Sequence, residues 1–165
     1  MLTLQKVNEA QIIDELRDKF GERIGTPERL RQHRIVVTVE KENLLDLAKF
    51  VKDTYDLNYA ISVSGIDYPE QNKFVVVYHL CKMSEEGHLP LVLTLKVPVN
   101  RQTPRTPSLI SIWQSVEWHE RETWELFGIE FEGHPKLERL LLHEDWDEEF
   151  PNQFPLRKDF LLEDE

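Results

Sequence analysis

The chain has 165 residues, of which 40% are hydrophobic and 31% are charged, and its formal net charge is −11. This length supports one hydrophobic core, and the acidic balance disfavours direct binding to nucleic acid or anionic lipid. The single cysteine, Cys81, excludes an internal disulfide and a four-thiolate iron–sulfur cluster, and no apolar run is long enough to cross a bilayer. We therefore expect one compact cytoplasmic domain without a cofactor.

The first hundred residues predict two helices and several short strands. Apolar residues at helical spacing predict a helix over 8–20, and a β-branched run predicts a strand over 33–40. The helical period returns over 42–55. Three strand-like runs follow at 57–66, 73–83 and 89–97, joined by turn-rich segments that suit an antiparallel meander. The expected fold class is α+β, an antiparallel sheet with helices packed on one face, followed by an extended C-terminal tail.

A further helical segment is expected to begin near Ser108 and to run, with or without a kink or break, to Phe127, because Thr106-Pro107 is typical of a helix start and Gly128 of a stop. At about 100° per residue, most apolar side chains of this segment fall on one arc. The opposite arc carries acidic residues and an arginine, and we expect it to face solvent; its members are Glu117, Arg121, Glu122 and Glu125.

Three residues of this segment break the pattern. Glu120 and His119 fall among the apolar residues, whereas Trp118 falls among the charges. A carboxylate in apolar surroundings is costly unless it is paired or protonated, so Glu120 is expected to meet an arginine (Arg139 or Arg157), a backbone donor or a partner chain. A kink that turns it into water and a general-acid role are the alternatives. Trp118 on a charged face suggests a protein contact.

An enzyme hypothesis would use the histidines and carboxylates of the same region. A stand-alone metal-dependent hydrolase could be built from His119, Glu120 and His134, although their spacing matches no diagnostic metal motif. His119 is otherwise expected to be a core or interface histidine. Cys81 lies in a predicted strand, which favours a packed thiol over a nucleophile.

The negative charge is concentrated at the C-terminal end. Residues 1–116 hold 15 acidic and 15 basic residues, whereas 117–165 hold 16 and 5. We expect residues 1–143 to form a single α+β domain and 144–165 an extended, acidic, aromatic docking tail punctuated by prolines. Its rings should lie along a groove of a larger protein, because an extended chain offers them little local surface. A loosely ordered terminus is the alternative.

Two stretches resemble a known family. Trp118-His119-Glu120-Arg121-Glu122-Thr123-Trp124-Glu125-Leu126-Phe127-Gly128-Ile129, followed by Phe131-Glu132-Gly133-His134-Pro135, resembles the signature of the family formed by the C subunits of NADH dehydrogenase (complex I). Pro155-Leu156-Arg157-Lys158-Asp159-Phe160 does so as well. The chain departs from the family pattern at Glu138, where a basic residue is usual, and in a longer segment over 147–154.

The resemblance implies a cofactor-free structural subunit of the peripheral arm of complex I or of a related membrane-bound hydrogenase. In that family the chain packs on a hydrogenase-like large subunit, next to the iron–sulfur small subunit, at the cytoplasmic face of the membrane. Neighbouring subunits carry the electrons, and their transfer is coupled to ion translocation. The departures favour a hydrogenase-like or ferredoxin-linked branch.

Together, the residue pattern and the resemblance nominate partner-binding residues and no catalytic, cofactor-binding or metal-binding ones. An independent adaptor domain of the same fold is a further alternative. The expected partner-binding residues are Trp118, Glu120, Arg121, Trp124, His134, Trp146, Phe150, Phe154, Arg157, Lys158 and Phe160.

Overall fold

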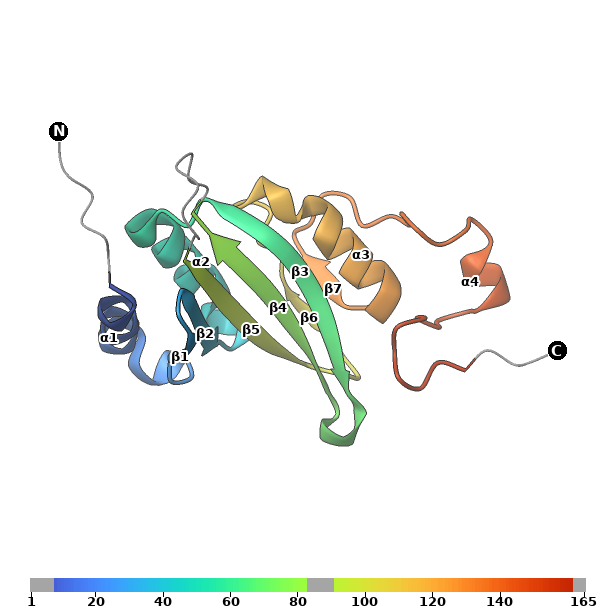
Figure 1. Cartoon of the computed structure of the whole chain (residues 1–165). Helices are drawn as coiled ribbons and strands as arrows, with labels where there is room; N and C mark the ends of the chain where they lie inside the picture. Colours follow the sequence, from blue (N-terminus) through green and yellow to red (C-terminus); the bar gives the residue numbers. More distant parts are fainter. Residues whose placement is uncertain (1–7, 83–90, 162–165) are drawn as a thin grey trace.

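The computed structural model describes residues 8–82 and 91–161 and contains a five-stranded sheet (Figure 1). The strand order is β1-β2-β5-β4-β3, in which only the β2–β5 pair is parallel. The mostly antiparallel α+β fold class is therefore confirmed. The strands are β1 (Glu28–Arg31), β2 (Arg34–Thr38), β3 (Tyr59–Tyr68), β4 (Lys73–Cys81) and β5 (Val92–Asn100).

Helices and short elements surround this sheet. The α-helices are α1 (Glu9–Phe20), α2 (Lys41–Tyr55), α3 (Glu117–Phe127) and the short α4 (Trp146–Glu149). The 3-10 turns are η1 (Gly21–Arg23), η2 (Pro69–Gln71) and η3 (Gln114–Val116), and a second, parallel pair of strands is formed by β6 (Arg105–Pro107) and β7 (Glu130–Glu132). None of the helices in the described part of the chain is both long and apolar enough to span a membrane.

The first two helices form where the sequence predicts them. The Asn8 side chain accepts a hydrogen bond from the Ala10 amide, and the Gln11 side chain accepts one from the Asn8 amide, so α1 begins with a capping box. Helix α1 then buries Ile12, Leu16 and Phe20 at spacings of four residues. In α2 the buried residues are Leu44, Leu47, Ala48, Val51 and Tyr55.

The hydrophobic core lies on one face of the sheet. The pairing of β4 with β5 sets alternate residues opposite one another, so that Phe74, Val76, Tyr78 and Leu80 meet Val99, Val97, Leu95 and Leu93. These side chains join the buried residues of α1, α2 and the segment before α3 in one core cluster. In Figure 1 the strands β3, β4 and β5 stand in the foreground, with α2, β6 and β7 behind them.

Helix α3 closes the sheet at its β3 edge. A Cβ atom at Gly65 of β3 would lie 2.7 Å from the Phe127 ring, so the absence of a side chain lets the end of α3 approach the strand closely. Phe127 also packs edge-on against Phe74, with ring centroids 6.2 Å apart. The end of α3 is therefore fixed against both β3 and β4.

Two predictions about secondary structure are wrong. The helix begins at Glu117 and not at Ser108, because the Ile112 and Trp113 amides both bond to the Leu109 carbonyl and Trp113 then takes an extended conformation. Strand β1 was not expected. Its four residues are all exposed, so it shows no apolar alternation.

Candidate docking surface

Glu120 is completely buried under α3 and joins three parts of the chain. Its carboxylate accepts hydrogen bonds from the Tyr78 hydroxyl (3.1 Å), the Leu109 amide (2.9 Å) and the Ser108 hydroxyl. Burial raises the pKa of Glu120 to about 7, although these three hydrogen bonds oppose the shift. The expected pairing of Glu120 with Arg139 or Arg157 is wrong, whereas the expected backbone donor is found in the Leu109 amide. Glu120 instead ties α3 to β4 and to the turn at 108–109.

Glu125, further along α3, is also completely buried. The sequence pattern placed it on the solvent side, and that prediction is wrong. Its carboxylate accepts hydrogen bonds from the backbone amides of Leu140, Leu141 and Leu142, at 2.8–3.1 Å. Three amide donors on one carboxylate satisfy a buried charge without a basic side chain. Glu125 therefore holds a segment that follows it by about 15 residues.

Arg121 holds the same segment by its carbonyl groups. The guanidinium donates to the Glu138 and Arg139 carbonyl oxygens, at 3.2 Å, and is 5% exposed. It was expected on the solvent arc, so its burial is a second correction. The guanidinium also lies 5.0 Å from the centre of the Trp118 ring. Residues 138–142 are thus fixed along the side of α3 that carries Trp118.

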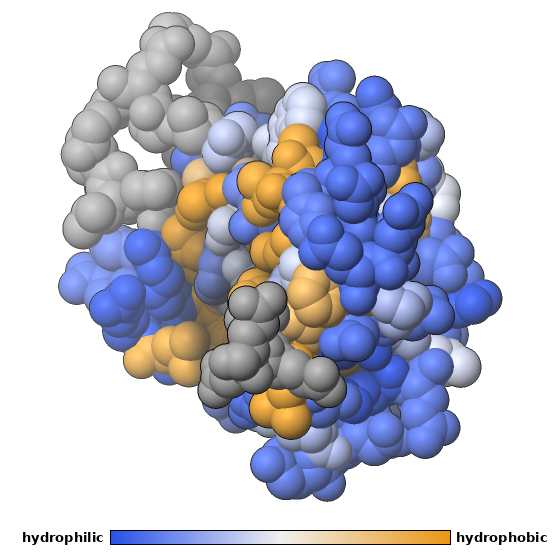
Figure 2. Space-filling view, turned by 90° about the vertical axis from the view of Figure 1, so that its right-hand side faces the viewer, coloured by the Kyte–Doolittle hydropathy of each residue, from blue (hydrophilic) through white to orange (hydrophobic). Residues whose placement is uncertain are grey.

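This arrangement turns apolar side chains outward. Trp118 is 56% exposed, Leu141 is 60% exposed and Leu140 is 37% exposed. We call Trp118, Leu140 and Leu141 the α3 surface. Figure 2 looks onto the side of the molecule that carries α3 and the C-terminal segment, and hydrophobic residues are visible there among hydrophilic ones. Exposed apolar residues with a charged border are typical of a protein contact.

His134 has a local structural role. Its Nδ1 accepts a hydrogen bond from the Lys136 amide (3.1 Å), so Nε2 carries the proton and donates to the Glu117 carbonyl (3.1 Å). His119 contributes its own carbonyl to a bond from the Thr123 hydroxyl. The described residues contain no group of three or more His, Cys, Asp or Glu side chains that could hold a metal ion. The three residues of the hydrolase hypothesis are therefore not brought together as ligands.

The C-terminal segment is attached to the domain at its far end. Asp67 of β3 is buried and accepts hydrogen bonds from both the Arg101 guanidinium and the Lys158 amide (2.9 Å). Burial opposes ionisation, but these donors hold the pKa of Asp67 below its usual value. Arg101 also pairs with Asp159 at 2.6 Å. A link between β3, Arg101 directly after β5 and residues 158–159 thus fixes the end of the segment.

Arg157 fills the space left by a glycine. It donates to the Phe127 carbonyl (2.7 Å) and lies 4.3 Å from the centre of the Phe154 ring. Gly128 has φ +72°, and a Cβ atom there would lie 2.5 Å from the Phe154 ring and 2.6 Å from the Arg157 guanidinium. Gly128 therefore both ends α3 and admits the C-terminal segment.

The aromatic residues of the segment pack on one another. Trp146 is 8% exposed and contacts Phe150 and Phe160, with ring centroids 4.5 and 5.9 Å apart. Its indole N–H donates to the Gln153 carbonyl. We predicted that the rings of residues 144–165 would find little surface to pack on within the chain. This prediction is wrong for Trp146, because the short helix α4 folds the segment back on itself. Arg139 pairs with Asp147 and connects this cluster to α3.

The predicted partner-binding residues thus fall into two groups. Only Trp118 and Lys158 are exposed, and the others are buried or half-buried with contacts inside the chain: Glu120, Arg121, Trp124, His134, Trp146, Phe150, Phe154, Arg157 and Phe160. Glu125, Asp67, Leu140 and Leu141 were not predicted as site residues. The one pattern that could have indicated the two leucines is the run Leu140-Leu141-Leu142 within an acidic part of the chain.

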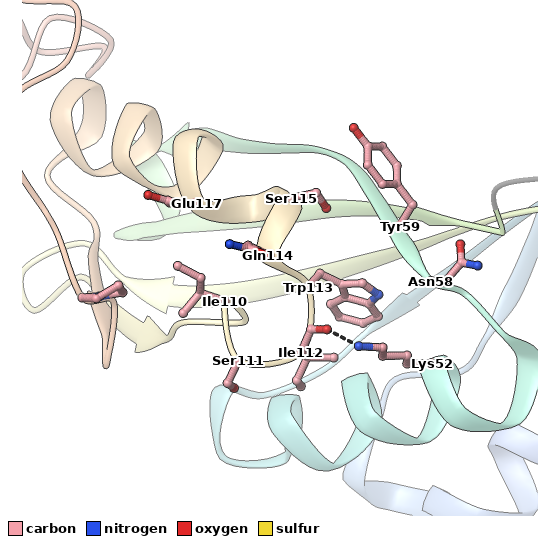
Figure 3. A pocket seen from close by; sticks show the side chains of 11 residues that line it. Lys52, Asn58, Tyr59, Ile110, Ser111, Ile112, Trp113, Gln114, Ser115 and Glu117 are labelled. Carbon is pink, nitrogen blue, oxygen red and sulfur yellow. Dashed lines mark hydrogen bonds between the residues drawn. The ribbon is translucent and has the colours of Figure 1, made fainter.

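A separate groove of about 760 Å³ lies between the end of α2, the start of β3 and residues 110–117 (Figure 3). In Figure 3 the Lys52 ammonium donates to the Ile112 carbonyl, beside the Trp113 ring. The Trp113 indole donates to the Leu57 carbonyl (2.7 Å), and the Ser115 hydroxyl bonds to the backbone of Ala60. These contacts hold η3 against the sheet, so we assign the groove no chemistry.

The chain matches known proteins over most of its length. Residues 37–165 match the family model of the respiratory-chain NADH dehydrogenase 30 kDa subunit. The C subunit of the F420H2 dehydrogenase of Methanosarcina mazei is 35% identical over 90% of this chain and 89% of its own length. The C subunit of the NADH-quinone oxidoreductase of Chlorobium phaeobacteroides is 33% identical, over 92% and 87%.

Solved structures share the fold. A chain of the archaeal membrane-bound sulfane sulfur reductase superposes with a TM-score of 0.76 at 22% identity, covering 93% of this chain and 85% of that one. A trypsin-resistant fragment of Nqo5 superposes with a TM-score of 0.64 at 28% identity, covering 78% and 98%. At 22% identity the first likeness concerns the fold alone.

Proposed function

Because the chain belongs to the respiratory-chain NADH dehydrogenase 30 kDa subunit family, we propose that it is a structural subunit of a complex I-like membrane-associated oxidoreductase. The chain contributes no catalytic site of its own. Electron transfer and the ion translocation coupled to it belong to the other subunits. The complex is of the NADH- or F420H2-dehydrogenase type, or of the hydrogenase type.

The α3 surface is the observation that carries this proposal. The side chains of Glu125 and Arg121 are buried, and they form hydrogen bonds with the backbone of residues 138–142. This arrangement leaves an exposed tryptophan beside two exposed leucines. Burying these charged side chains costs desolvation energy. We therefore expect residues 138–142, which they hold in place, to have a defined shape that fits a partner. Exposed Trp is also the residue type most enriched at the energetic centres of protein interfaces.

The partners that we propose are the hydrogenase-like large subunit and the adjacent iron–sulfur small subunit. The large subunit lies over the α3 surface and the C-terminal segment, where exposed acidic residues of α4 and its flanks would meet basic residues of the partner. Contact with the membrane is made only through the complex, on its cytoplasmic side.

The test is a double substitution, Trp118→Ala with Leu141→Ser, in the tagged chain expressed with its native complex. We expect at least a tenfold lower recovery of the large subunit, because an anchor and its neighbour are both removed. Leu30→Ser is the matched control, since Leu30 is 62% exposed on β1, far from α3 along the sheet order. Unchanged recovery of the large subunit with the double variant would contradict the proposal, provided that the variant unfolds at the same urea concentration as the parent.

A further inference from the structure

The outward side of α3 carries a stripe of side chains that begins at the α3 surface and leads away from it. Trp118, Glu122 and Leu126 follow one another at spacings of four residues, so they lie on the same side of the helix. Trp118 and Glu122 are exposed, and Leu126 is half-buried. Arg121, which lies against the Trp118 ring, is on one side of Trp118 around the helix, and Glu122 is on the other.

The C-terminal segment adds an apolar residue to this stripe. The Leu156 amide donates to the Leu126 carbonyl (3.1 Å), which fixes Leu156 at the end of α3, and Leu156 is 51% exposed. Glu122, Leu126 and Leu156 line a hollow of about 150 Å³, whose opposite wall is residues 63–65 of the edge strand β3. The stripe thus combines an exposed carboxylate with apolar side chains from two parts of the chain.

Glu122 is the only ionisable residue that lines this hollow. Its side chain makes no ion pair or hydrogen bond with any other residue in the described part of the chain. Arg121, next to it in sequence, and Arg157, next to Leu156, both donate to backbone carbonyl oxygens instead. A partner that covers the stripe would remove water from this carboxylate, and that desolvation is offset only if the partner supplies a cation.

On the basis of the proposed function, we propose that an arginine of the large subunit pairs with Glu122 and lays its aliphatic stem against Leu126 and Leu156. The negative charge selects a cation. The exposed ring and leucines around it select arginine over lysine, because a guanidinium is less strongly hydrated than an ammonium and stacks on aromatic rings. A second copy of this chain is disfavoured as the source, since residues 117–165 hold 16 acidic and 5 basic residues and repel one another.

Carboxylate footprinting tests the contact in the intact complex, purified through a tag on this chain. Carbodiimide with glycinamide labels accessible carboxylates, and mass spectrometry measures the extent at each residue. Glu122 should be labelled roughly tenfold less in the complex than in the isolated chain, because a covered ion pair excludes the reagent. Glu42, exposed on α2, is the matched control and should be labelled equally in both samples. Equal labelling of Glu122 in the two samples would overturn the proposal.

Phenylglyoxal, which modifies arginine, identifies the other half of the pair. One arginine of the large subunit should be protected in the parent complex and should react roughly fivefold faster in the Glu122→Gln complex, since it has lost its partner. A carbodiimide link from Glu122 to a lysine of the large subunit, or arginine reactivity that does not change in the variant, would each contradict the pairing.

Recovery of the large subunit separates this contact from the proposed function. Glu122→Gln should lower recovery about fivefold and Glu122→Arg about twentyfold, because repulsion then replaces attraction. Glu42→Gln, with the same change of charge, should leave recovery unchanged. If the Trp118→Ala with Leu141→Ser variant releases the large subunit and Glu122→Arg does not, the arginine contact is wrong and the proposed function stands. If neither variant releases it, both are wrong.

Discussion

The five-stranded sheet and the region around α3 place their charged side chains differently. On the sheet face that is turned away from the core, Lys73, Lys96 and Arg34 are half-buried, and Glu28 of β1 lies on the same face, opposite Val36. Around α3, two carboxylates are fully buried and each is saturated by donors from distant parts of the chain. The acidic third therefore uses part of its charge to build its own structure. The sheet keeps its charged side chains exposed or half-buried, apart from Asp67.

The strongest way to break this contrast is to remove the carboxylate that holds residues 140–142. Glu125→Ala leaves three backbone amides without an acceptor, and we expect the free energy of unfolding to fall by about 4 kcal/mol. Urea unfolding followed by tryptophan fluorescence measures the loss. Hydrogen exchange of the Leu140, Leu141 and Leu142 amides should accelerate in the same variant. Native protection of these amides would show that Glu125 does not hold them.

A second test concerns pH. The folded pKa of Glu120, about 7, lies above the ordinary value of 4.5, so the folded chain binds a proton more tightly than the unfolded chain. Stability from this group is complete below about pH 4.5 and is lost as pH rises through 7, by about 3 kcal/mol in all. His79 acts in the opposite direction, because burial and Arg34 lower its pKa.

The variant Glu120→Gln separates these two effects, since it removes the carboxyl titration and keeps a group of the same shape. The difference in unfolding free energy between parent and variant should change by about 3 kcal/mol between pH 4.5 and pH 8.5. Unfolding curves in urea at several pH values provide the measurement. A difference that does not vary with pH would mean that Glu120 is ionised throughout.

The ionic link at the end of the C-terminal segment should have a smaller effect. Asp67→Asn weakens the bonds to Arg101 and to the Lys158 amide, and we expect it to cost about 2 kcal/mol. Limited proteolysis should then cut within residues 155–161 before it cuts the sheet. Asp53→Asn, on the exposed side of α2, should change neither quantity. Equal proteolysis of the two variants would argue against the link.

The smallest effect is expected from two half-buried lysines of the sheet, Lys73 of β4 and Lys96 of β5. In the isolated chain, Lys73→Glu with Lys96→Glu should change the free energy of unfolding by no more than about 0.5 kcal/mol, because partly exposed cations on a sheet contribute little. Thermal and urea unfolding of the isolated chain provide the measurement. A loss near that of Glu125→Ala would show that these lysines stabilise the fold itself, and the contrast between the two regions would disappear.

Local patterns predicted much of the fold. The apolar spacing of α1, the apolar period of α2 and the β-branched runs of β4 and β5 each depend on residues close in the sequence. Strand β1 lacked such a pattern. The start of α3 was misplaced because the turn at Leu109 and the extended Trp113 depend on contacts with Glu120, β3 and α2.

The candidate site was less predictable for the same reason. Trp118 was identified because it breaks the helical pattern of its own segment. Glu125 fits that pattern as a solvent-facing residue, and only the return of residues 140–142 along α3 buries it. Asp67 likewise acquires its role from Arg101 and Lys158, which are 34 and 91 residues away.

The hydrogen bonds from backbone amides to Glu125 determine which residues of the α3 surface can be substituted. Three main-chain amides present the same groups whatever side chains project from them, so the outward residues at positions 140–142 can be exchanged without loosening the anchor. Proline is the exception, since it has no amide hydrogen to offer. The hydrogen bonds to Glu125 and the outward side chains can therefore change independently, so the same fold can bind neighbours of different shape.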